Sequence, residues 1–264
     1  MVLSSSVYSL LSLSKDSNNK FPEQPPTVHF FKFQKMEKVF VVNKPKGKTS
    51  YQVVSEYKRR FIGEKVGHAG TLDPLAEGVL IILVGKATKK QSEFMAMKKE
   101  YLAEASFGVV TPTWDLEGGP EFFPTESLKQ KLENLSAGKV SRELLRFVPE
   151  FEQTIPAFSA VKVSGRRLYR LARKGKVDLK NLPKRKAMIY RIKLESFTKA
   201  SFPKGVKITP QSLLEYGPKA KIRMEVGKGT YVRSLVYQLG RQLGVGATTS
   251  LIIRTRIGQF RLSF

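Results

Sequence analysis

The sequence of 264 residues contains no cysteine and only two histidines, His29 and His68. The absence of cysteine excludes disulfide bonds, thiolate catalysis and cysteine-ligated metals. Two histidines so far apart in the chain argue against a metal site, and we expect neither a metal nor another cofactor. No apolar run approaches the ~20 residues that a helix needs to cross a bilayer, so we expect no membrane association.

Acidic residues are also scarce. The chain carries 22 of them against 47 lysines and arginines, which gives a net charge of +25. An excess of this size indicates a polyanionic partner, because lysine and arginine gain affinity by displacing counterions from phosphates. An anionic membrane surface would also fit, but the sequence has no long basic amphipathic helix, and nucleic acid is the preferred partner.

Residues 1–35 differ in composition from the rest of the chain. They are rich in serine and poor in acids, as organellar transit peptides are, but they contain no arginine and few lysines. Met36 lies directly before the first apolar segment and would be an ordinary start. We therefore expect 1–35 to be a disordered or non-native extension without function, 36–264 to be the folded domain, and the location to be cytoplasmic, or organellar if a transit peptide is genuine.

Short apolar runs alternate with helical periodicities along residues 36–264. The expected strands are 37–42, 78–84, 101–107, 186–202, 219–226 and 258–264. The expected helices are the one that Thr49 or Ser50 caps, then 86–97, 125–136, 166–176 and 231–243. Few strict βαβ units occur in this order, so the pattern predicts an α+β fold whose sheet is mixed or mostly antiparallel.

The stretch Gly-His-Ala-Gly-Thr-Leu-Asp-Pro-Leu-Ala-Glu-Gly, at 67–78, is the most distinctive of the chain. Its glycines permit a positive φ, while Pro74 fixes its own φ and biases Asp73 towards an extended conformation. A carboxylate on such a stiff turn, directly before a buried strand, suits chemistry. On these residues alone, however, an aspartate that merely caps a turn is the preferred interpretation.

The longer run favours the functional interpretation, because it closely resembles the catalytic motif of the TruB family of pseudouridine synthases, whose aspartate is the nucleophile. Four further stretches occur in the family's order: NKPKGKTS at 43–50, KEY at 99–101, FSAVKVSGRRLY at 158–169 and GTYVR at 229–233. The resemblance implies the pseudouridine synthase fold, a curved mixed sheet flanked by helices around a central cleft, with an RNA-binding insertion at about 147–183.

The resemblance implies isomerisation of uridine to pseudouridine at position 55 in the T-loop of tRNA, without a cofactor or an obligate protein partner. The residues Leu-Ala-Glu-Gly that follow the Asp-Pro pair are more similar to the stand-alone bacterial enzymes than to guide-RNA-dependent relatives. A guide-dependent synthase and a non-catalytic tRNA-folding chaperone remain alternatives. Many relatives have a C-terminal RNA-binding PUA domain, for which we expect no room here, and we expect the basic charge to compensate.

Three residues match the family's catalytic positions. Asp73 matches the nucleophile, Arg233 the arginine that pairs with it, and Tyr101 the tyrosine that lies against the target base and assists proton transfer. Without the resemblance, Arg233 would be a surface residue at a helix start and Tyr101 a strand core aromatic.

Substrate-binding positions are also implied. His68 matches a histidine that fills the space left by the extruded base, and Tyr231 and Ile252 match residues that line the base pocket. The chain departs from the family's Leu-Arg-Arg-Thr-Arg pattern, because Ile253 stands where an arginine is usual. We expect this replacement to remove a phosphate or structural contact.

Other stretches surround these positions. Lys44 and Pro45 are interpreted as structural residues of the cleft floor, and Asp115 as an anchor of the active-site loop or an ordinary turn residue. A basic cluster within the insertion is expected to contact RNA, since aromatic and apolar residues are interleaved with it. It comprises Lys162, Arg166, Arg167, Arg170, Arg173 and Lys174.

Overall fold

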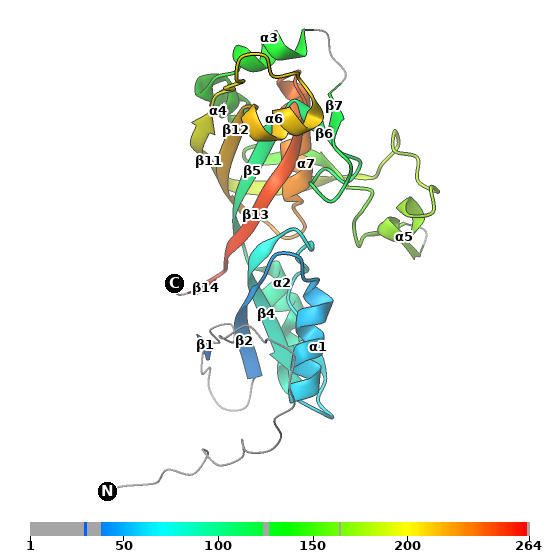
Figure 1. The fold of residues 1–264 in the computed structure, drawn as a ribbon. Helices are drawn as coiled ribbons and strands as arrows, with labels where there is room; N and C mark the ends of the chain where they lie inside the picture. The colour runs from blue at the N-terminus through cyan, green and yellow to red at the C-terminus, as the bar shows by residue number, and fades with distance from the viewer. Residues whose placement is uncertain (1–28, 31–37, 124–126, 164, 263–264) are drawn as a thin grey trace, which may run out of the picture.

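The computed structural model describes residues 29–30, 38–123, 127–163 and 165–262. A ten-stranded sheet extends through the molecule (Figure 1), in the order β1-β2-β4-β13-β5-β12-β11-β8, with β3 beside β4 and β14 beside β13. Its strands are β1 (His29–Phe30), β2 (Lys38–Lys44), β3 (Val66–His68), β4 (Glu77–Val84), β5 (Lys99–Phe107), β8 (Glu150–Thr154), β11 (Lys184–Thr198), β12 (Lys219–Val226), β13 (Ala247–Ile257) and β14 (Phe260–Arg261). Two small ribbons pair β6 (Val109–Val110) with β7 (Glu121–Phe122) and β9 (Lys162–Val163) with β10 (Arg166–Arg167).

The helices lie on or beside this sheet. They are α1 (Ser50–Arg60), α2 (Gln91–Ala96), α3 (Leu128–Glu133), α4 (Ala137–Leu145), α5 (Leu168–Ala172), α6 (Pro210–Tyr216), α7 (Val232–Gln242) and a 3₁₀ helix, Gly85–Lys90. Among the described strands of the sheet, β4 and β13 are parallel and the other pairs antiparallel. The predicted α+β fold with a mixed sheet is therefore confirmed. No helix in the described ranges is both long enough and apolar enough to span a membrane.

One half of the molecule contains β2, β3 and β4 with α1 and α2 (Figure 1). Thr49 caps α1 through a reciprocal capping box with Gln52, as expected from its position before the apolar helical face. That face packs against one side of β4, and a second apolar cluster covers the other side. Burial on both sides explains why residues 79–84 form a continuous apolar run instead of an alternating one.

The other half contains β5, β12, β13 and β11, on which α7 and α4 pack (Figure 1). Apolar side chains of α7, including Leu235 and Leu239, are fully buried against small residues of the sheet such as Ala103 and Ala220. Small residues on the strands allow the helix to approach the sheet closely. Arg233, in the first turn of α7, is thereby brought next to the loop that precedes β4.

The two halves join where β4 runs parallel to β13, through the pairs Glu77–Ile253 and Gly78–Arg254. Gly78 has a φ of 105°, and a Cβ atom at this position would lie 2.3 Å from the carbonyl oxygen of Arg254. Only glycine therefore allows the two strands to meet. The loop that carries Asp73 immediately precedes this junction, so the junction positions the candidate nucleophile.

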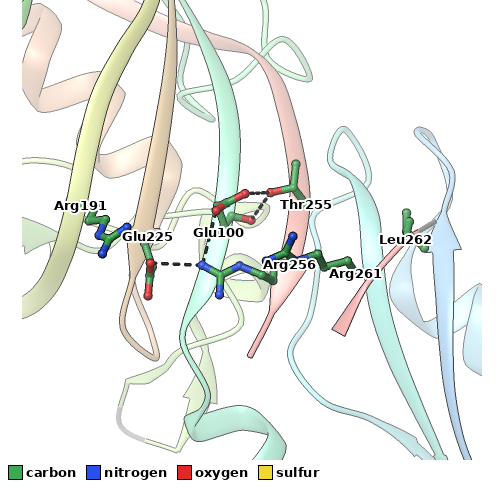
Figure 2. A pocket seen from close by; sticks show the side chains of 7 residues that line it. All are labelled: Glu100, Arg191, Glu225, Thr255, Arg256, Arg261 and Leu262. Carbon is green, nitrogen blue, oxygen red and sulfur yellow. Dashed lines mark hydrogen bonds and ion pairs between the residues drawn. The ribbon is translucent and has the colours of Figure 1, made fainter. Parts of the chain in front are cut away.

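A network of charged side chains connects β5, β12 and β13 (Figure 2). It lies on the face of the sheet opposite to that of Tyr101, because neighbouring residues of a strand point to opposite faces. Glu100 of β5 accepts a 2.6 Å hydrogen bond from Thr255 and lies 3.4 Å from Arg256, which also lies 3.2 Å from Glu225 of β12. Burial opposes ionisation of Glu100, but the Thr255 hydroxyl and the neighbouring arginines outweigh it and hold the pKa of Glu100 below its usual value. Each partly exposed pair contributes little by itself, yet together they fix the register of β5 against β12 and β13.

Three sequence-based predictions of elements are corrected. The helix expected at 166–176 is the strand β10 followed by the short helix α5, because Gly165, at φ 77°, turns the chain into a hairpin. The strand expected at 258–264 is the two-residue β14, since Gly258 starts a turn that folds the chain back onto β13. The helix expected at 125–136 is the shorter α3, and α4 follows a new cap at Ser136; residues 124–126 lie outside the described ranges.

The extension predicted at 1–35 lies mostly outside the described residues. Within it, His29–Phe30 forms β1, which pairs with Phe40 and Val41 of β2. The prediction for this segment remains a prediction.

Candidate active site

The loop that carries Asp73 is held from two sides. The Ser50 hydroxyl, at the start of α1, donates to the carbonyl oxygen of Leu72 and accepts from its amide, at 3.1 and 2.9 Å. The fully buried Lys44 ammonium donates to the carbonyl oxygens of Lys48, at 2.6 Å, and Pro74, at 3.3 Å. Burial lowers the pKa of Lys44 to about 8, although the nearby Asp73 opposes this shift. These contacts agree with the structural role expected for Lys44.

Arg233 lies between two carboxylates. Its Nε is 2.9 Å from Oδ2 of Asp73, and its Nη1 is 3.4 Å from Oδ2 of Asp115. The side chains of Arg233 and Asp115 are 3% and 2% exposed, whereas that of Asp73 is 34% exposed. Within the described ranges the Nε atom has no aligned hydrogen bond, so its contact with Asp73 is mainly electrostatic. Nη1 and Nη2 instead donate to the carbonyl oxygens of Thr113 and Phe158.

Asp115 is positioned by hydrogen bonds to its side chain and its backbone. Its Oδ1 accepts hydrogen bonds from the Thr113 hydroxyl, at 2.6 Å, and from the Glu117 amide, at 3.0 Å, and its backbone bridges to Thr249 of β13. A buried guanidinium near a helix N-terminus is unfavourable unless it is paired. The two aspartates supply that compensation, and of the two only Asp73 remains accessible to a ligand.

Asp73 opens into a cavity of about 310 Å³, within the range of small-ligand pockets. Four other residues singled out in the sequence line the same cavity: Arg233, Tyr101, Tyr231 and Ile252. Burial raises the pKa of Tyr231, while the Ser159 hydroxyl and the Arg185 charge oppose the shift. The cavity therefore combines one accessible carboxylate with two aromatic rings and an aliphatic side chain.

Arg254 is a site residue that the sequence analysis did not single out. It is 1% exposed and donates to the carbonyl oxygens of Val79, at 2.7 Å, and Gly70, at 3.0 Å, and its Nη1 lies 3.4 Å from the Tyr101 hydroxyl. Strand alternation from Ile252 is the signal that could have identified it, because residues two apart share a face. Ile253 does not line the cavity, so its replacement of the usual arginine leaves the cavity wall unchanged.

Two hydroxyls and a lysine complete the cavity wall. The side-chain oxygens of Ser159 and Thr230 are buried. The Thr230 hydroxyl has no hydrogen-bond partner in the described part of the chain, whereas the Ser159 hydroxyl acts on Tyr231. Lys99 donates to the carbonyl oxygens of Met95 and Met97, and burial, with Arg254 as the next cause, lowers its pKa to about 8. An unpaired buried hydroxyl in a cavity, such as that of Thr230, is suited to binding a polar ligand edge.

His68 faces a second cavity, of about 700 Å³, which also includes Asp73 and Arg233. Asp73 therefore lies at the boundary of the two cavities. The Nδ1 atom of His68 is buried without a partner among the described residues, and burial followed by the Arg254 charge lowers the pKa of His68. The imidazole is consequently neutral near pH 7, as suits a group that contacts a base instead of a phosphate.

The basic cluster of the insertion borders this second cavity. Arg167, Arg170 and Arg173 line it, whereas Lys162, Arg166 and Lys174 line only a neighbouring hollow of about 1,000 Å³. The segment around α5 stands out from the sheet (Figure 1) and is anchored by Leu168, which packs in a cluster with Trp114 and Ile155. These six cations, three of which line the same cavity as Asp73, are called the basic wall, and they are suited to a phosphate backbone.

Comparison with protein families gives a match over residues 58–232 to the model described as TruB family pseudouridylate synthase, N-terminal domain. Curated proteins named tRNA pseudouridine synthase B are similar to the chain over most of its length. That of Fusobacterium nucleatum is 37% identical over 86% of this chain and 70% of its own length. That of Bacteroides fragilis is 41% identical over 85% of this chain and 88% of its own.

Solved structures give a consistent result. A chain of a Cbf5–Nop10–Gar1 complex aligns with a TM-score of 0.52 and 28% identity over 85% of this chain. A chain of an H/ACA RNP bound to a substrate RNA aligns with a TM-score of 0.50 and 26% identity. This chain spans about half the length of those two chains, at 50% and 49%.

Replacement of Asp115 by asparagine tests the buried ion pair. The variant keeps the amide oxygen that Thr113 and Glu117 bind but loses the charge that faces Arg233. We expect the free energy of unfolding to fall by about 3 kcal/mol, as for other broken buried pairs, measured by urea denaturation. The exposed Asp178→Asn is the control. Equal stability of the Asp115→Asn variant and the wild type would show that Asp73 alone compensates Arg233.

The lowered pKa of His68 predicts a pH dependence of stability. Between the native pKa and the ordinary value of 6.5, the unfolded chain binds more protons than the native protein. The His68 contribution is therefore complete above about pH 6.5 and is lost as the pH falls through that window. Urea unfolding between about pH 5 and 7 should show a smaller loss for His68→Asn than for wild type or His29→Gln. An identical loss in all three would contradict the prediction.

Proposed function

The chain belongs to the TruB family of pseudouridylate synthases, and from this premise we propose that it converts uridine 55 in the T-loop of tRNA to pseudouridine with Asp73 as the nucleophile. The observation that carries the proposal is the Asp73–Arg233 ion pair, whose carboxylate is the accessible acid of a cavity otherwise lined by cations, aromatic rings and hydroxyls. Family membership supports the reaction class, and this geometry supports the residue.

The reaction is an isomerisation that conserves all atoms. The bond between N1 of the base and C1′ of the ribose breaks, and a bond between C5 and C1′ forms; C5 gives up a proton and N1 gains one. No electron acceptor is consumed. The protein must therefore stabilise the ribose C1′ atom from which the base has detached, keep the base within reach, and accept a proton from C5.

Asp73 serves the first of these requirements. A carboxylate adds to the electrophilic C1′ carbon and leaves it again when the base returns through C5. Once the base closes the cavity, the carboxylate loses contact with water, which is costly for a charged group. The Arg233 guanidinium at 2.9 Å offsets this cost, and Asp115 on its far side holds the guanidinium in place.

The rings of Tyr101 and Tyr231 and the side chain of Ile252 serve the second requirement. A uracil extruded from its stack can lie between aromatic and apolar groups that exclude water. The Tyr101 hydroxyl, next to the Arg254 guanidinium, is the group that we assign to proton transfer at C5. His68 is assigned to the space that the extruded base leaves in the RNA, since it borders both Asp73 and the basic wall.

Two alternatives to a stand-alone enzyme make different predictions. A synthase that requires protein partners would be inactive as a purified chain on bare tRNA. A tRNA-folding chaperone would bind tRNA without modifying it, but it would have no use for an accessible Asp73 paired with a buried arginine. Independence of protein partners and a cytoplasmic location remain predictions.

The decisive experiment maps pseudouridine by mass spectrometry in unmodified tRNA incubated with wild type, Asp73→Asn and, as a matched acid control, Asp178→Asn. We expect modification at position 55 by wild type and the control, and a loss of at least ~10⁴-fold with Asp73→Asn, the order expected when a nucleophile is removed. Modification by Asp73→Asn at the wild-type rate would overturn the assignment. Modification at another uridine would keep the chemistry and change the substrate.

The basic wall predicts a salt-dependent affinity. We expect glutamine at Arg170 and Arg173, which border the cavity of His68, to weaken tRNA binding and to reduce the slope of log affinity against log salt by about 1.5, or roughly 0.7–0.9 per lost phosphate contact. Fluorescence anisotropy over a range of salt concentrations measures both quantities. Lys58→Gln with Arg59→Gln, in the exposed last turn of α1, is the control pair. If the salt slope of the Arg170 and Arg173 variant equals that of the wild type, the tRNA backbone does not contact these two arginines.

A further inference from the structure

Arg185 is a cation of the active-site cavity that the proposed reaction does not use. It lies on β11 between Lys184 and Lys186, each of which pairs with a glutamate of β8, at 3.3 and 2.6 Å. Side chains alternate between the faces of a strand, so Arg185 points to the opposite face from its neighbours. On that face it lines the cavity that contains Asp73.

The guanidinium of Arg185 is held in a defined orientation. It lies over the ring of Tyr231, 5.3 Å from the ring centroid, and its Nη2 donates to the carbonyl oxygen of Gly229. Gly229 has a φ of 82°, and a Cβ atom there would lie 2.7 Å from Nη2, so the loop has glycine where Arg185 crosses it. The fully buried Gln153 holds the same loop through two hydrogen bonds. Its Nε2 donates to the carbonyl oxygen of Gly229, at 2.8 Å, and its Oε1 accepts from the amide of Tyr231, at 2.9 Å.

The remaining donors of Arg185 have no acceptor in the described part of the chain. No carboxylate of the described residues pairs with this side chain, although each neighbouring lysine has one. Two further donors line the same cavity: the exposed Lys228 and the buried Thr230 hydroxyl, which likewise has no hydrogen-bond partner among the described residues. The cavity wall thus offers a guanidinium, an ammonium and a hydroxyl, a set of donors that suits an anion.

A nucleotide extruded into this cavity brings phosphates with it. If its base lies against Tyr231 and its C1′ atom against Asp73, the two phosphates that flank its ribose stay towards solvent. Arg185 is an exposed residue of the cavity wall and can reach such a phosphate. Arginine binds phosphate in a bidentate manner and is the side chain best suited to a planar, directional contact of this kind. Resting on the function proposed above, we propose that Arg185, with Lys228 and Thr230, binds a backbone phosphate flanking the target uridine.

This contact differs from those of the basic wall, because it forms only when the nucleotide has left the RNA stack. Its binding energy is therefore used to hold the extruded state and to align C1′ with Asp73, and not to attract RNA in general. Arg185 is accordingly a positioning residue. Its loss lowers kcat/KM for modification much more than it lowers the affinity for an RNA whose target base stays stacked.

A double-substitution cycle between protein and RNA tests the proposal. The substrates are T-arm stem–loops in which the phosphate on the 5′ or the 3′ side of the target uridine is replaced by a neutral methylphosphonate. The proteins are wild type, Arg185→Gln, Arg185→Lys and the matched control Lys186→Gln from the same strand. Initial rates give kcat/KM for every combination, and thermal melting of each variant reports its folding.

For wild type and Lys186→Gln, one of the two neutral linkages should reduce kcat/KM roughly tenfold or more, the value of a charged hydrogen bond. In Arg185→Gln the same linkage should cause little further loss, because the partner of the phosphate is already absent. The linkage effect in Arg185→Lys should lie between those of wild type and Arg185→Gln, because lysine keeps the positive charge but lacks the paired donors of a guanidinium.

The proposal would be overturned if the loss of kcat/KM from Arg185→Gln and the loss from the neutral linkage multiply when the two changes are combined. Arg185 would then only support Gly229 and Tyr231. A wild type that is insensitive to both neutral linkages would also overturn the proposal. A lowered melting temperature without a linkage-specific effect would overturn it in the same way. If the wild type modifies none of the RNAs, that result counts against the proposed function instead. The same cycle of protein and RNA variants is then measured on binding affinity, by fluorescence anisotropy, in place of kcat/KM.

Discussion

The structure depends most on the placement of Arg233 between Asp73 and Asp115. A guanidinium that is 3% exposed requires compensating charge, and each aspartate supplies it from a different loop. One carboxylate is buried and accepts two hydrogen bonds through Oδ1, while the other is open to the cavity. Because Asp115 is buried and Asp73 is partly exposed, the two aspartates have different roles. Asp115 holds Arg233 in place, and Arg233 orients the Asp73 carboxylate towards a substrate.

This arrangement requires the two halves of the sheet to meet in one register. Asp73 belongs to the half formed by β2, β3 and β4, whereas Arg233 and Tyr101 belong to the half built on β5 and β13. Gly78 permits the parallel contact at which the halves join, and Arg254 reaches back across it to the carbonyl oxygens of Val79 and Gly70. On the reverse face, the charge network around Glu100 fixes the strands that carry the site.

The sequence predicted much of this and missed parts for physical reasons. One cavity is lined by four residues that the family resemblance singled out: Asp73, Tyr101, Tyr231 and Ile252. The strand of Tyr101 and the strand after the Asp73 loop were predicted from their apolar patterns, but β13, which carries Ile252, was not. Arg254 escaped notice because no strand was predicted over 247–257, so its alternation with Ile252 was not used. The carbonyl oxygens that it binds also lie 175 and 184 positions away in the chain. The segment after Gly165 was predicted as one helix, since basic and apolar residues follow a helical period there, but the turn at this glycine extends a hairpin into it.

The measurement that tests the central claim most directly is a double-mutant cycle on the single-turnover rate of pseudouridine formation with Arg233→Lys, Asp115→Asn and both together. Because Asp115 is held to act through Arg233, we expect the double variant to be no slower than the slower single variant, within the ~0.5 kcal/mol error of such cycles. Rate losses that multiply would show that the two residues act independently and would contradict the claim that Asp115 presents the nucleophile through the arginine.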